Sequence, residues 1–173
     1  MKEIPSEFSH FVDVDRIPAS GFVLNLKADE KQCSDLAKRF GLEAIHSLSA
    51  ELTFKRINKK RVRVDADFEA EVEQVCVVTL EPFSQKVKDS FSVVFSQETD
   101  TSVRLNEIDL DMSENDDVEF LQNNKIDAGE LVAEYFSLAL DPFPHSPNAV
   151  FHAEPDAETD ENAFSVLEKL KLK

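Results

Sequence analysis

Apolar and charged residues alternate without interruption along one long segment in the middle of the chain. From residue 61 to residue 73 every second position is apolar, and each position in between is charged. Successive side chains of an extended strand point to opposite faces, so this pattern buries one face and exposes the other. It predicts a half-buried strand of an antiparallel sheet, with a core face made by Val62, Val64, Ala66, Phe68, Ala70 and Val72.

The segments on either side predict two further strands. Residues 48–54 have apolar side chains at alternate positions, and a turn near residues 57–60 joins them to the central segment. A third strand is expected over residues 87–95, after the Glu81-Pro82-Phe83 sequence. Together these segments predict an antiparallel meander.

The first forty residues predict two strands followed by a helix. Apolar patterns over residues 8–16 and 21–26 flank a turn at residues 18–21. Asp29 is a suitable N-cap, and Gly41 supplies the left-handed residue that commonly follows the end of a helix. The expected order is therefore strand, strand and helix.

After the meander the pattern weakens and then becomes helical. Residues 97–117 are acidic and polar, which favours an irregular segment, and residues 118–121 are expected to form a short strand before a turn at residues 123–124. Asp127 and Glu130 have the spacing of a capping box, and the helix that they begin ends before Pro142. Residues 163–171 predict a small amphipathic helix.

These elements predict an α+β protein with a single domain over residues 1–151. It contains the meander, a helix after the first two strands and a second helix near residues 127–140. An acidic linker follows over residues 152–161, and residues 162–173 form a C-terminal amphipathic helix or tail. An open sheet and a flattened barrel are equally compatible with the pattern, because sequence alone gives no strand order.

The chain is strongly acidic, yet many of its basic residues are concentrated in one turn. It has 19 basic and 35 acidic residues and a net charge of −16, which opposes general binding to nucleic acid. Residues 52–64, however, contain six basic residues and no acidic one. These six are our candidate RNA-binding residues: Lys55, Arg56, Lys59, Lys60, Arg61 and Arg63.

This basic turn has two interpretations. Strand alternation places Lys55, Arg61 and Arg63 on the outward face, and acidic residues from Asp65 to Glu73 continue the same face with the opposite charge. Such a face can present its basic end to phosphates while its acidic part repels nonspecific RNA or faces basic proteins. The simpler interpretation is a solvated turn whose charges prevent aggregation at a sheet edge, and the pattern alone favours it.

The predicted C-terminal helix is a second candidate binding element. Phe164, Leu167 and Leu170 have the spacing of anchors that enter a groove on a partner. Docking of the same helix onto the chain's own domain is an equally good interpretation.

The sequence contains no pattern typical of catalysis, of a cofactor site or of a metal site. Cys33 and Cys76 lack the close spacing of zinc ligands, and three glycines are too few for a phosphate-binding loop. The four histidines have no nucleophile motif beside them, and the acidic residues between 109 and 117 lack the glycine and terminal glutamate of an EF-hand. Without a signal-peptide core or a membrane-spanning segment, we expect a cytoplasmic protein with no cofactor, metal or small-molecule substrate.

Three motifs follow one another in the second half of the chain. They are Cys76-Val77-Val78-Thr79-Leu80-Glu81-Pro82-Phe83, Ile126-Asp127-Ala128-Gly129-Glu130-Leu131-Val132-Ala133-Glu134 and Leu138-Ala139-Leu140-Asp141-Pro142-Phe143-Pro144. With the ending from Asn162 to Lys171, they resemble the YceD family of bacterial proteins. The resemblance implies a role in the accumulation of large-subunit ribosomal RNA, in a family not known for catalysis. Many relatives carry further cysteines where this chain has Thr79, His145 and Asn148, so no metal role is expected at these positions here.

Three hypotheses follow for function. The leading one is a non-catalytic ribosome-biogenesis factor that binds precursor ribosomal RNA or an early large-subunit particle, with the basic turn touching RNA and the C-terminal helix touching protein. The alternative is an acidic adaptor or chaperone that holds a basic ribosomal protein without direct RNA contact. A hydrolase or nuclease built from the acidic residues is a third class, but no motif brings acids and a general base together.

Overall fold

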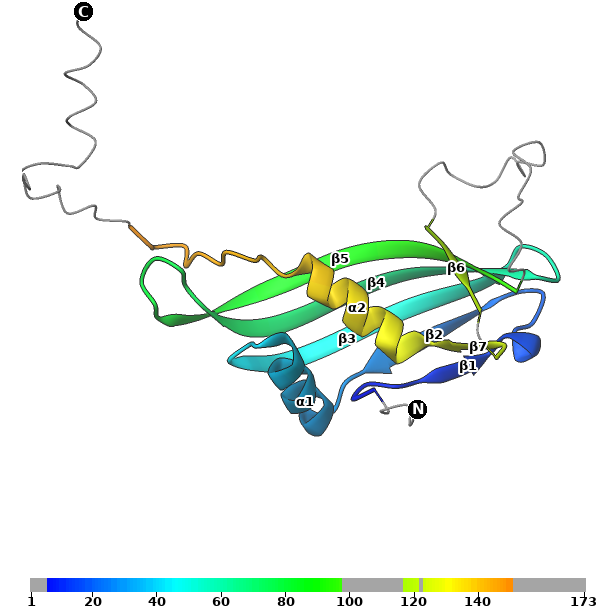
Figure 1. Ribbon diagram of the computed structural model, residues 1–173, viewed down its shortest axis with the longest axis horizontal. Coiled ribbons are helices and arrows are strands. Elements are labelled where there is room, and N and C mark those ends of the chain that lie inside the picture. Colours follow the sequence, from blue (N-terminus) through cyan, green and yellow to red (C-terminus); the bar gives the residue numbers. More distant parts are fainter. Residues whose placement is uncertain (1–5, 98–116, 122, 151–173) are drawn as a thin grey trace, which may run out of the picture.

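A computed structural model describes residues 6–97, 117–121 and 123–150, and its centre is a five-stranded sheet. The strand order is β2-β3-β4-β5-β6, and the first four strands are antiparallel neighbours (Figure 1). The fifth runs parallel to β5. The sheet is open, and its strands are β2 (Phe22–Lys27), β3 (Ala44–Arg56), β4 (Arg61–Val75), β5 (Pro82–Ser96) and β6 (Asp117–Phe120).

The alternating segment forms the middle strand of this sheet, as predicted. Every apolar residue from Val62 to Val72 in β4 is buried, because these side chains share one face with the apolar residues of β3 and β5. One row across the sheet pairs Leu24, Leu52, Ala66 and Phe91. The predicted strands over residues 48–54 and 87–95 lie within β3 and β5, and the turn between β3 and β4 falls at residues 57–60.

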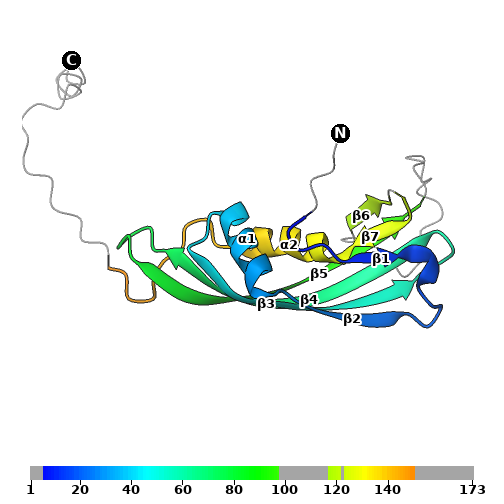
Figure 2. The ribbon, with the colours of Figure 1, turned by 90° about the horizontal axis from the view of Figure 1, so that it is seen from below.

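The other described elements cover the apolar face of the sheet. The opposite face is exposed over much of β2 to β4, but Val94 and Ser96 of β5, which point to that face, are buried. Figure 2 shows the two helices, α1 (Glu30–Phe40) and α2 (Ala128–Ala139), and the short strands β1 (Phe11–Asp13) and β7 (Lys125–Asp127) on the same side of the sheet. A row of polar residues crosses the other side, which we call the uncovered face: Asn25, Glu51, Asp67 and Ser90. The molecule therefore has two layers, with its core between them.

The first predicted strand is shorter than expected and pairs elsewhere. β1 does not pair with β2; it forms a separate two-stranded sheet with β7. The strand ends at Asp13, whose side chain accepts a hydrogen bond from the Asp15 amide and so begins the 3-10 helix η1 (Val14–Arg16). β7 was not predicted, because a three-residue strand with one apolar side chain, Ile126, has no visible period.

Strand β6 confirms the predicted strand near residues 118–121, but it does not extend the antiparallel meander. It pairs with the end of β5 in parallel, Val94 opposite Val118. A parallel neighbour requires a long connection, and residues 97–116 supply one. Residues 98–116 of the predicted irregular segment lie outside the described residues. The predicted linker and the predicted C-terminal helix, beyond residue 150, also lie outside them.

The two predicted helices that lie within the described residues begin at the predicted caps. Asp29 and Gln32 form a complete capping box on α1, and Gly41 follows its end with a φ of 68°. On α2 the Asp127 side chain accepts hydrogen bonds from the amides of Gly129 and Glu130. The predicted capping box is incomplete there, because the Glu130 side chain turns away to residues of other elements. Within the described residues, no helix combines the length and the apolar character needed to cross a membrane.

The first turn of α2 lies directly against the N-terminal segment, so we expect Gly129 to be essential there. A Cβ at Gly129 would lie 1.7 Å from the carbonyl oxygen of Phe8. Gly129→Ala should therefore lower the free energy of unfolding by about 1–3 kcal/mol, the usual cost of overpacking, in chemical denaturation. At Gly41 a Cβ meets nothing within 4 Å, so Gly41→Asn, which tolerates a positive φ, is the near-neutral control. Equal stability of Gly129→Ala and wild type would contradict this packing.

Candidate nucleic-acid interface

The six candidate basic residues lie at one end of the sheet, at or near the turn between β3 and β4. The turn is held by backbone bonds from the amides of Ile57 and Asn58 to the Arg61 carbonyl, 3.0 and 3.3 Å long. The Asn58 side chain also accepts a hydrogen bond of 2.8 Å from the Lys60 amide. The loop therefore holds its basic residues on a defined backbone.

Arg56 differs from the other five residues. It follows buried Phe54 by two positions, so its side chain leaves on the covered face of the sheet. One guanidinium nitrogen, Nη2, donates to the carbonyl oxygens of Val14 and Ile17 at 2.6 and 3.2 Å. Arg56 thus fastens η1 to the end of β3.

Lys55 and Arg63 face each other across the strands on the uncovered face, and both pair with Asp65. The Lys55 ammonium lies 3.1 Å from one carboxylate oxygen of Asp65, and Arg63 Nε lies 3.0 Å from the other. The Ser92 hydroxyl donates to the same carboxylate at 2.8 Å. Burial alone would raise the pKa of Asp65, but hydrogen bonds from Ser92, Lys55 and Arg63 lower it below its usual range. This cluster has a net charge of +1.

The remaining cations lie in the turn itself. Lys59 and Lys60 are exposed, and Arg61 is half-buried at the start of β4. The Lys60 carbonyl accepts a hydrogen bond of 2.9 Å from the Gln97 amide, which joins the turn to the end of β5. The basic end of the uncovered face, as the structure defines it, consists of Lys55, Lys59, Lys60, Arg61 and Arg63.

Beyond Asp65 the same face becomes acidic, as the sequence predicts. Asp67 stands opposite Glu51, and Glu69 forms an ion pair of 2.6 Å with Lys88 on β5. This hydrogen bond with Lys88 lowers the pKa of Glu69. A shallow hollow of about 680 Å³ lies here between the charged side chains. At the outward positions of β2, β3, β4 and β5 there is no Phe, Tyr or Trp side chain, and Phe54 packs inward against Phe22 at 4.8 Å between ring centroids.

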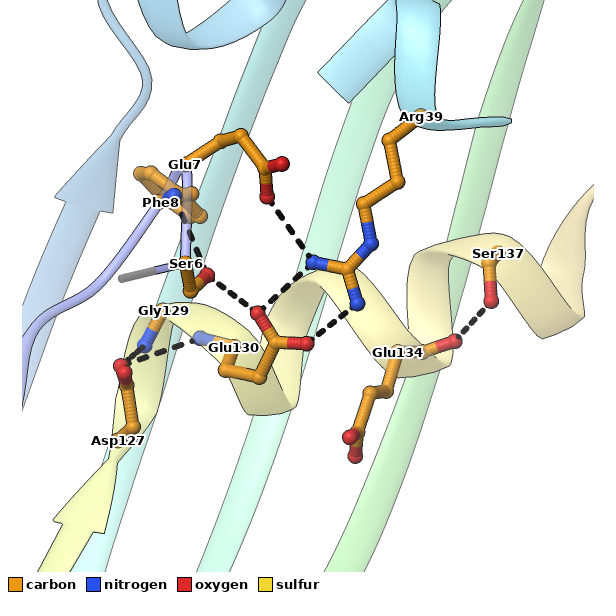
Figure 3. A network of polar contacts seen from close by, with 9 residues as sticks. All are labelled: Ser6, Glu7, Phe8, Arg39, Asp127, Gly129, Glu130, Glu134 and Ser137. Atoms are coloured by element: carbon orange, nitrogen blue, oxygen red, sulfur yellow. Dashed lines mark hydrogen bonds and ion pairs between the residues drawn. The ribbon is translucent and has the colours of Figure 1, made fainter. Parts of the chain in front are cut away.

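A second polar cluster joins three parts of the covering layer (Figure 3). The guanidinium of Arg39 on α1 makes two parallel bonds to the Glu130 carboxylate on α2, 2.9 and 2.5 Å long. It also donates to Glu7 at 3.2 Å, and the Ser6 hydroxyl donates to Glu130. Hydrogen bonding from Arg39 lowers the pKa of Glu130. The carboxylates bind a cation within the protein, so this cluster is structural in character.

The turn between β4 and β5 is built around Cys76, which is fully buried. Its sulfur accepts hydrogen bonds from the backbone amides of Thr79 and Ser146 at 3.5 and 3.3 Å. Hydrogen bonds, first from the Thr79 side chain and then from backbone amides, lower the pKa of this thiol to about 6. Across the described part of the chain, no group of three or more metal-binding side chains is found. The candidate residues Phe164, Leu167 and Leu170 lie outside the described residues.

Comparison with known protein families matched the chain to a family model. Residues 64–171, more than half of the chain, match the model of the large ribosomal RNA subunit accumulation protein YceD. The comparison with curated proteins gave no match at the threshold applied, and neither did the comparison with solved structures.

The structural role of Arg56 predicts that it matters for stability. Arg56→Met should lower the free energy of unfolding by about 1–3 kcal/mol, because two backbone carbonyls at the start and end of η1 lose a charged donor. Lys59→Met removes one positive charge from the same turn and should change stability by less than about 0.5 kcal/mol. Chemical denaturation measures both, and equal effects would contradict the assignment.

The Arg39–Glu130 pair predicts a pH-dependent contribution to stability. Glu130→Gln should lower the free energy of unfolding by about 1–2 kcal/mol at pH 7, because it weakens the two partly exposed hydrogen bonds from the Arg39 guanidinium. The pKa of Glu130 is lowered on folding, so the contribution is present above its ordinary value of 4.5 and is lost as the pH falls through the folded value. The stability difference from wild type should therefore narrow below about pH 4.5.

Glu134, one turn later on α2, is the matched control for this pH dependence. Burial, and then the charges of Glu119 and Glu130, raise its pKa. Glu134→Gln should therefore leave stability unchanged or increase it at pH 7. A loss of stability in Glu134→Gln as large as that in Glu130→Gln would show that the Arg39 fork is not the cause.

Proposed function

We propose that this chain, which belongs to the YceD family of large ribosomal RNA subunit accumulation proteins, acts by direct contact with large-subunit ribosomal RNA. Membership of the family implies a role in the accumulation of that RNA. The contact is non-catalytic and takes place in the cytoplasm, on precursor RNA or an early large-subunit particle. The basic end of the uncovered face makes it.

The observation that carries this proposal is the gathering of cations on one exposed end of an otherwise acidic protein. Lys55, Lys59 and Lys60 are exposed, and they lie beside the half-buried Arg61 and Arg63 at the end of the sheet where Val94 and Ser96 of β5 are buried. Lysine and arginine bind phosphates mainly by charge. By the relation for duplex DNA, five such residues give a slope of log affinity against log salt no steeper than about −4.5.

The same surface limits what kind of RNA contact is expected. Binding of single strands without sequence preference usually relies on aromatic side chains on which bases stack. The outward positions of β2 to β5 carry no Phe, Tyr or Trp side chain. Contact with phosphates of a folded or duplex segment therefore fits this face better than stacking with bases. The acidic residues from Asp67 to Glu73 would repel RNA that runs farther along β4.

A second function is favoured by those acidic residues. Asp67, Glu69 and Glu71 point from β4 into solvent on the uncovered face, beside Glu51 of β3. A basic ribosomal protein could lie along them, in which case the basic turn would contribute only solubility. On this alternative the chain is an adaptor or chaperone, and its complex survives nuclease treatment.

Ultraviolet crosslinking in cells, followed by RNA sequencing, separates the two functions. The basic variant replaces Lys55, Lys59, Lys60, Arg61 and Arg63 with Ser and keeps Arg56, so that η1 remains fastened. We expect the wild type to crosslink to large-subunit ribosomal RNA and the basic variant to lose at least about nine-tenths of the signal, because the cations that we propose to bind phosphates are removed.

The matched control removes acidic charges from the same face: Glu51→Gln, Asp67→Asn, Glu69→Gln and Glu71→Gln. Crosslinks to RNA should persist or increase in this variant. If wild type gives no crosslinks above background, and the acidic variant alone loses a nuclease-resistant ribosomal-protein partner, direct RNA contact is refuted in favour of the adaptor.

A further inference from the structure

A groove of about 380 Å³ lies between the C-terminal ends of α1 and α2. Apolar side chains from both helix ends and from the following segment line it, and two acidic residues, Glu43 and Asp141, are exposed there. We call it the α1–α2 groove. Its apolar lining residues are Phe40, Leu42, Val75, Leu140, Pro142 and Pro144.

Apolar side chains at this groove are incompletely covered. Phe40, Leu42 and Leu140 pack against the core but remain partly exposed. Phe143, between the two prolines that line the groove, is 68% exposed. Contiguous exposed apolar surface on a protein commonly marks a place where another segment binds.

We propose that the α1–α2 groove binds the chain's own C-terminal segment, residues 162–171, through Phe164, Leu167 and Leu170. The three side chains have the spacing of one helix face. A helix of ten residues is marginal in water on its own, so it requires a surface against which to bury that face. The proposal goes beyond RNA binding and does not depend on it.

Charge complementarity supports this occupant. Residues 162–173 contain three lysines and one glutamate, whereas the whole chain has a net charge of −16. Glu43 and Asp141 at the groove can face Lys169 and Lys171 when the apolar residues dock. The segment is thus a basic amphipathic sequence and the groove an apolar surface with acidic residues.

The length of chain also permits the contact. The described chain lines the groove at Pro144 and continues to Val150, six residues later and therefore at most about 20 Å away. Residues 151–163 can span up to about 45 Å, twice the distance needed to return. Such a tether gives an effective concentration on the order of 1 mM, so an intrinsic dissociation constant of about 0.1 mM suffices for nine-tenths occupancy.

Amide hydrogen exchange of the full-length protein, followed by mass spectrometry, tests the docking. Exchange over residues 163–171 should be about 10-fold slower in wild type than in Leu167→Asp, which places a charge on the anchoring face. Ser165→Asp adds the same charge to the opposite face of the helix and should leave the protection intact. Exchange in β3 and β4 should be equal in all three proteins, as the control for folding.

Two groove variants identify the binding surface. Leu42→Asp should remove the protection of residues 163–171, and Glu43→Lys, which alters only an exposed charge, should reduce it about two- to threefold. If wild type exchanges in this segment as fast as Leu167→Asp, there is no docking. Protection that increases with protein concentration would assign the groove to a second copy, and protection retained in both groove variants would place the segment on another surface. Each of these three results overturns the proposal.

Discussion

The structure depends on the period-two pattern of its long strands, which bury one face and leave the other in water. β4 is fifteen residues long, and its side chains from Val62 to Val72 alternate between core and solvent. Burying one large apolar side chain stabilises a protein by about 1.5–3 kcal/mol, so the register of this strand is strongly fixed. A shift by one residue would bring the charges of Asp65 and Asp67 into the core.

One-sided burial separates the residues that stabilise this molecule from the charged residues that we propose to bind RNA. The covered face determines the fold through α1, α2 and the β1–β7 ribbon. On the uncovered face of β2 to β4 the side chains do not pack in the core. Charged residues can therefore occupy these positions with little loss of stability. That freedom allows a basic end at Lys55 and Arg63 and an acidic continuation on the same surface. The covering layer, in turn, is held by contacts that join distant parts of the sequence, notably Arg39 with Glu130.

The elements that could be predicted from the sequence are those specified by interactions between neighbouring residues. β4, the caps of both helices and the turn at residues 57–60 were predictable because each is specified by a few neighbouring residues. β7 and its pairing with β1 were not, since Ile126 alone gives no period. The Arg39–Glu130 pair joins residues 91 positions apart, and neither residue differs locally from an ordinary helix charge.

Arg56 is the instructive case within the candidate site. Its charge and its place in a basic turn group it with Lys55 and Lys59, and composition alone does not distinguish them. The alternating pattern of β3 does distinguish Arg56, because this residue stands two positions after Phe54 and therefore on the buried side of the strand. Strict use of the period-two rule would have assigned it to the covered face. Neither its charge nor its position in the strand indicates a function. The link to large-subunit ribosomal RNA comes from the family match.

The role of the basic end in cells is tested by the ratio of large- to small-subunit ribosomal RNA when the only copy of the gene is altered. Cells with the wild-type gene and cells with Arg56 kept but Lys55, Lys59, Lys60, Arg61 and Arg63 changed to Ser are compared, with a deletion strain as reference. If the basic end of the sheet binds RNA, the variant protein should accumulate normally while the ratio falls to that of the deletion strain. A wild-type ratio in the variant, under conditions where the deletion lowers it, would contradict a role for the basic end of this sheet.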